Sequence, residues 1–69
     1  MIHYHEYQYF CVCRDAYVSR VSVVDSHGKE FFQIVERDAK GYRERRDAAI
    51  EACCEAIEQG CDPGEVRLA

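Results

Sequence analysis

Three consecutive segments of this 69-residue chain carry apolar side chains on both strand faces, and one helical segment follows to cover them. Residues 7–13, 17–24 and 30–36 are rich in aromatic and β-branched residues and are separated by short polar breaks, as in strands joined by turns. Clean apolar-polar alternation, which marks a sheet with one face in water, is absent. We therefore expect the face left uncovered to meet water, a second copy of the chain or a partner.

Residues 42–59 have the spacing of an amphipathic helix. Gly60 stands where a helix C-terminus is expected, and Pro63 bars continuation. The four alanines of residues 48–56 form a small-residue face suited to a second helix. The apolar residues expected to pack on the sheet are Ile50, Cys53, Cys54, Ile57 and Cys61.

These elements predict the fold class. We expect a single small α+β domain over residues 1–69, with a three-stranded antiparallel sheet followed by one helix packed on one face. Residues 65–68 are a candidate for a short C-terminal edge strand. A chain of this length buries only roughly 60% of the surface its unfolded form exposes, so association with another molecule would stabilise it.

The turn signals leave the strand register open. A two-residue turn at His27-Gly28 pairs Val24 with Phe31. A similar turn at residues 15–16 brings the tyrosines of the first strand onto the same face, and one more turn residue would exchange the faces. In either register the open sheet face is a candidate partner-binding or dimer surface. The residues expected on it are Tyr7, Tyr9, Phe31 and Val35.

Carboxylates form their own stripe on the predicted helix, which we call the acidic stripe. Some of its members are like-charge pairs four residues apart, which cost a few tenths of a kcal/mol each. Residues 47–66 contain no lysine to offset them. Carboxylates about 5.4 Å apart along a helix can stand in for a run of phosphates on a basic partner surface. The acidic stripe consists of Glu44, Asp47, Glu51, Glu55 and Glu58.

Basic residues concentrate just before and at the start of this helix. Residues 37–46 hold five basic and two acidic residues, whereas residues 47–69 hold one basic and six acidic. A basic segment at a helix N-terminus can bind phosphates, with aromatic residues of the open sheet stacking on bases. Because acidic residues surround the segment, nucleic-acid binding is the alternative rather than the first interpretation. Its candidate residues are Arg37, Lys40, Arg43, Arg45 and Arg46.

No spacing indicates catalysis or a bound ion. Cys53 and Cys54 lie in the middle of the predicted helix on its core-facing side, where a thiolate is disfavoured. The His3-x-His5 and Cys11-x-Cys13 pairs share a strand face but lie too far apart for one metal ion, and there is no phosphate-binding glycine run. We expect a protein that is not an enzyme and binds no cofactor or metal.

The chain has tyrosine-rich strands, a hairpin at residues 23–32 and an acid-and-alanine helix at residues 47–59. In this overall build it resembles small phage-encoded inhibitor proteins. Anti-CRISPR proteins are the best-known group of these. The resemblance implies action without catalysis, by covering a nucleic-acid-binding or assembly surface of a host complex, and it assigns no functional residue. The strand and helix order is also similar to the double-stranded-RNA-binding domain and to HicB-type antitoxins. The first helix of the former and the glycine-rich early strand of the latter are missing here.

The sequence thus predicts a non-enzymatic inhibitor or adaptor that binds a host protein or protein complex, with a homodimer as a further option. The alternative is a small nucleic-acid-binding module, double-stranded-RNA-binding-like or antitoxin-like. The N-terminal residues lack a secretory signal, and no apolar run is long enough to span a bilayer. The five cysteines contain no Cys-x-x-Cys and are interpreted as reduced. We expect the cytoplasm, which is the host cytoplasm if the chain is phage-encoded.

Overall fold

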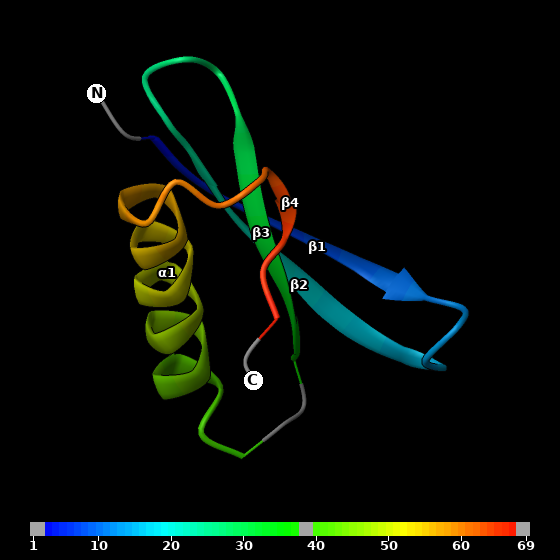
Figure 1. Ribbon diagram of the computed structural model, residues 1–69. Coiled ribbons are helices and arrows are strands. Elements are labelled where there is room, and N and C mark those ends of the chain that lie inside the picture. Colours follow the sequence, from blue (N-terminus) through cyan, green and yellow to red (C-terminus); the bar gives the residue numbers. More distant parts are fainter. Residues whose placement is uncertain (1–2, 38–39, 68–69) are drawn as a thin grey trace.

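A computed structural model of the chain describes residues 3–37 and 40–67 and has one sheet and one helix (Figure 1). The spatial order of the strands is β1-β2-β3-β4, in which β4 runs parallel to β3 and the other neighbours are antiparallel. The helix packs on one face of the sheet, which confirms the predicted α+β class and element order. The elements are β1 (His3–Cys11), β2 (Ala16–Val24), β3 (Glu30–Glu36), α1 (Tyr42–Glu58) and β4 (Gly64–Glu65).

The first hairpin turn is longer than predicted but keeps the faces of β1. Residues 12–15 form the loop, and Asp15 takes a left-handed conformation at φ 50°, which Asp tolerates better than most residues. Tyr9 pairs with Val18 instead of a position further along β2. Because this shift is an even number of residues, Tyr7 and Tyr9 remain on the face away from α1, as predicted.

The second hairpin turn differs from the prediction by one residue, and this exchanges the faces of β3. The Asp25 carboxylate accepts the backbone N–H groups of His27 and Lys29, each at 2.9 Å. Gly28 follows in the left-handed region at φ 79°. This combination closes a three-residue loop, in which a glycine or asparagine normally takes that last position.

Phe31 and Val35 are consequently core residues, and their predicted place on the open sheet face is wrong. Phe31 pairs with Val23 instead of Val24. Both Phe31 and Val35 point toward α1 and are buried, with 2% and 7% of their surface exposed. A shift of one residue moves every side chain of a strand to the other face.

Small residues of α1 make the closest contact with the sheet. Ala49, Cys53 and Ala56 are buried against valines of β2 and β3 and against Phe31. Much of the face predicted to receive a second helix is therefore part of the core. The larger residues of the predicted stripe flank this contact and are partly buried: Ile50, Cys54 and Ile57.

Two serines of β2 are fully buried on opposite faces of the sheet. The Ser19 hydroxyl lies under α1 and is hydrogen-bonded to the Tyr42 hydroxyl at 2.7 Å. The Ser22 hydroxyl lies on the open face and has no hydrogen-bond partner among the described residues. A buried hydroxyl destabilises a fold when it has no hydrogen-bond partner, and it stabilises the fold when it is hydrogen-bonded.

These two serines are expected to respond in opposite ways to the same substitution. Ser19→Ala should lower the free energy of unfolding by about 1 kcal/mol, because it removes a buried hydrogen bond. Ser22→Ala should leave that free energy unchanged or raise it by up to about 1 kcal/mol. Urea unfolding of both variants and the parent chain measures the difference, and equal losses would contradict the assigned hydroxyl environments.

Candidate functional site

The acidic stripe lies along the solvent side of α1. All five of its members are exposed, whereas Ala49, Cys53 and Ala56 bury the opposite side of the helix. Asp47 has a cation nearby, with its Oδ1 atom 3.2 Å from Nη2 of Arg46. Within the described residues, no charged nitrogen of Lys or Arg lies within 4 Å of a carboxylate oxygen of the other four. The stripe is therefore a negatively charged surface that the chain itself hardly neutralises.

A second surface lies on the β1–β2 hairpin, which extends away from α1 (Figure 1). The large apolar side chains that are exposed in the described structure all belong to it, and we call them the aromatic hairpin: Tyr4, Tyr7, Tyr9, Phe10, Val12 and Tyr17. They lie on both faces of the sheet, because Tyr7 and Tyr9 are on the open face and Phe10 and Tyr17 are on the helix side. The exposure of Phe10 and Tyr17 was not predicted, because we expected α1 to cover a whole face of the sheet.

Elsewhere on the open face, a charged side chain covers part of the sheet. The Arg20 guanidinium lies 3.8 Å from the centroid of the Phe32 ring, and its Nη2 atom is 2.7 Å from Oε1 of Glu30. This cation–π contact and ion pair place polar atoms over the centre of the face. The large apolar side chains that β1 exposes on the open face are Tyr7 and Tyr9, of which 54% and 41% is exposed.

The basic residues predicted for nucleic acid are dispersed. The Arg37 guanidinium lies over the Tyr42 ring at 5.2 Å, and Arg46 is partly buried and bonded to Asp47. Arg43 and Arg45 are exposed, but at about 100° per residue they point to opposite sides of α1. Exposed Lys40 precedes the helix. The five residues thus do not form a single flat patch.

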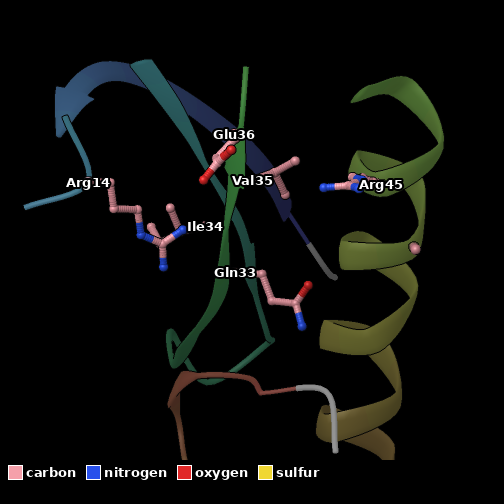
Figure 2. A pocket seen from close by; sticks show the side chains of 7 residues that line it. Arg14, Gln33, Ile34, Val35, Glu36 and Arg45 are labelled. Carbon is pink, nitrogen blue, oxygen red and sulfur yellow. The ribbon is translucent and has the colours of Figure 1, made fainter. Parts of the chain in front are cut away.

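A groove of about 400 Å³ follows the outer edge of β3, beyond the end of β4 (Figure 2). Successive residues 33–36 of β3 line it from both faces of the sheet. Figure 2 shows Arg14 of the β1–β2 loop on one side of the strand and Arg45 of α1 on the other. Residue spacing does not predict this juxtaposition, because the loop and the helix are far apart along the chain. Two guanidinium groups and the Glu36 carboxylate therefore line the same groove.

Glu6 connects the edge strand β1 to the first turn of α1. The Tyr4 hydroxyl donates to Oε2 of Glu6 at 2.6 Å, and the Tyr42 hydroxyl donates to Oε1. These bonds, the one from Tyr4 first, hold the pKa of Glu6 below its ordinary value. Partial burial and then the bond to Glu6 raise the pKa of Tyr4 to about 12. This carboxylate clamp joins residues that are 36 positions apart, so sequence spacing could not reveal it.

Cys53 is fully buried, and burial raises the pKa of its thiol to about 11, so the thiol stays protonated near neutral pH. Among residues 3–37 and 40–67, no group of three or more His, Cys, Asp and Glu side chains is placed to hold a metal ion.

In the part of the chain that the structure describes, no helix is both long enough and apolar enough to cross a membrane. Comparison of the chain with protein-family models, with curated proteins and with solved structures found no match.

Acidification is expected to weaken the carboxylate clamp. Because the pKa of Glu6 is lowered in the folded state, its contribution to stability is present above the ordinary carboxyl pKa of about 4.3. That contribution is lost as the pH falls through the lower folded value. Glu6→Gln should therefore reduce the free energy of unfolding at neutral pH and flatten its pH dependence between about pH 5 and 3.

Urea unfolding across this pH range measures the effect. Glu51→Gln is the matched control, since Glu51 is exposed and makes no side-chain hydrogen bond or ion pair within the described residues. The same pH dependence in both variants would show that the Glu6 carboxylate does not stabilise the fold.

Proposed function

We propose that this protein is a non-enzymatic inhibitor or adaptor that binds a basic surface of a partner protein or complex through the acidic stripe. The proposal rests on one observation: five exposed carboxylates share one side of α1, and four have no cation within 4 Å in the described residues. Like charges one turn apart destabilise a helix. Lys and Arg side chains of a partner would convert that repulsion into attraction on binding.

The surface that such a stripe fits best is one that normally holds nucleic acid. Carboxylates about 5.4 Å apart present a row of negative charge comparable to a phosphate backbone, and a surface rich in Arg and Lys attracts either. Occupying that surface blocks it without any chemical step. This is how inhibitors of the phage-encoded, anti-CRISPR kind typically act, and a phage-encoded chain would meet its target in the host cytoplasm.

Charge complementarity mainly raises the rate and selectivity of association, whereas stable interfaces also contain an apolar centre. The aromatic hairpin offers such apolar area on another part of the molecule, since the acidic stripe lies on the side of α1 that faces away from the sheet. The two surfaces can therefore be occupied at the same time. An adaptor that holds a target and a second molecule uses both.

Reversing two central charges of the stripe is expected to abolish the interaction. In Glu51→Lys/Glu55→Lys, two attractive contacts become repulsive, so the partner's dissociation constant should rise by at least about a hundredfold at low salt. The control is Glu36→Lys/Glu65→Lys, which changes net charge equally at exposed positions outside the stripe. The partner is first recovered from a host lysate with the parent chain, and its affinity is then measured by calorimetry at low and high salt.

Loss of binding in the stripe variant alone, together with binding that weakens as salt increases, supports the proposal. Equal affinity of the two variants would refute the stripe as the contact surface. The nucleic-acid alternative through Arg37, Lys40, Arg43, Arg45 and Arg46 is tested separately by a gel-shift titration with RNA and DNA at low salt. Tight binding there, removed by Arg43→Glu/Arg45→Glu, would replace the proposed function.

A further inference from the structure

β1 is a long edge strand with little of the usual protection against pairing with another strand. Its nine residues contain no proline and no lysine, and they pair with β2 without a bulge. β2 lies on one side of it, and no described strand lies on the other. Short length, lysine, proline, bulges and inward-pointing charges are the devices that normally keep such an edge from pairing. Of these, β1 has only the Glu6 carboxylate, which is hydrogen-bonded to the Tyr4 and Tyr42 hydroxyls. β1 is therefore available to add a further strand to the sheet.

The hydrogen-bond pattern shows which backbone groups face outward. The Arg37 N–H donates to the Tyr17 carbonyl at 3.0 Å, so odd-numbered residues of β2 direct their backbone groups toward β3. Even-numbered residues of β2 then face β1, where Arg20 pairs with Tyr7. Odd-numbered residues of β1 are thus bonded to β2. The residues whose N–H and C=O groups point to the free edge are Tyr4, Glu6, Gln8 and Phe10.

A second copy of β1 can pair with this edge in few registers, because outward-facing residues must meet outward-facing residues. An antiparallel pair centred on Glu6 would set that carboxylate opposite its own copy, which is unfavourable. A pair centred on Gln8 would set Glu6 opposite Phe10 and shorten the overlap. A pair centred on Tyr7 avoids both problems and aligns the whole of residues 3–11.

We propose that two copies of this chain associate edge to edge through β1, antiparallel and with a two-fold axis at Tyr7. The sheet then continues through both copies. The facing pairs across the axis are Tyr4 and Phe10, His5 and Tyr9, Glu6 and Gln8, and the two Tyr7 residues. The exposed aromatic side chains of β1 thus each gain an aromatic ring opposite, and such cross-strand pairs stabilise a sheet.

The arrangement leaves room for the helices. A two-fold axis between antiparallel strands is perpendicular to the sheet, so both copies of α1 lie on the same face. Each helix packs over β2 and β3, with its own β1 between it and the axis. The acidic stripe stays exposed on both copies, so dimerisation is compatible with the proposed function and independent of it.

Substitutions at Gln8 test the register through charge. Gln8→Glu places a carboxylate opposite Glu6 twice in the dimer, whereas Gln8→Lys places an ammonium group there. Sedimentation equilibrium should show a parent species of twice the 8.0 kDa chain mass. We expect its dissociation constant to rise between about twofold and thirtyfold in Gln8→Glu and to fall by a similar factor in Gln8→Lys. Gln59→Glu and Gln59→Lys, at the exposed helix end, are the matched controls.

Three results would overturn the proposal. They are a monomer at the highest soluble concentration, a dimer indifferent to the Gln8 charge, and equal responses to substitution of Gln8 and Gln59. Amide hydrogen exchange of the parent chain gives a second readout that needs no variant. On concentration, the amides of Tyr4, Glu6, Gln8 and Phe10 should become protected. Protection elsewhere, with these four unchanged, would indicate a different contact such as one between open sheet faces.

Discussion

The width of one helix limits what this fold can cover. An α-helix with its side chains is about 10 Å across, and neighbouring strands lie about 4.8 Å apart, so one helix shields roughly two strands. α1 accordingly packs over β2 and β3. β1 lies outside that footprint and is joined to the helix by the bond between Tyr42 and Glu6. The exposure of Tyr4 and Phe10, which lie on the helix side of β1, follows from this limit.

The bulk of the side chains on the sheet explains why small residues of α1 face it. Phe31 and the valines of β2 already fill the space above the sheet, so α1 approaches through Ala49, Cys53 and Ala56. The bulkier Ile50 and Ile57 then reach outward to the margins of the contact. With its inner side held this way, the helix directs the acidic stripe to solvent. The core-facing side and the proposed binding surface are thus opposite sides of α1.

Local sequence signals predicted the secondary-structure elements. They did not predict the strand register, which depends on how distant residues pair. Gly60 and Pro63 indicated the end of α1 to within one residue, and residues 30–36 were identified correctly as a strand. The register of β3 was wrong, because the Asp25 carboxylate and Gly28 close a longer turn than a two-residue hairpin. β1 begins at His3, earlier than predicted, since polar and charged residues at its start concealed its strand character.

The candidate sites, too, could be predicted only where their residues lie close together in the sequence. The acidic stripe could be predicted because its members share one helix, and their exposure confirms the predicted geometry. Phe31 and Val35 could not be placed without the register. The Glu6 clamp and the groove that joins Arg14 with Arg45 depend on segments that meet only after folding. Residue spacing along the chain does not predict such contacts.

We propose that Tyr7 and Tyr9 of the aromatic hairpin serve association rather than the chain's own core. The most direct measurement is the free energy of unfolding of Tyr7→Thr/Tyr9→Thr in urea, at a protein concentration too low for association. Because threonine suits strands and only about half of each ring is buried, we expect a loss below about 2 kcal/mol. A loss of about 3 kcal/mol or more, as for truncation of a buried aromatic residue, would contradict the claim.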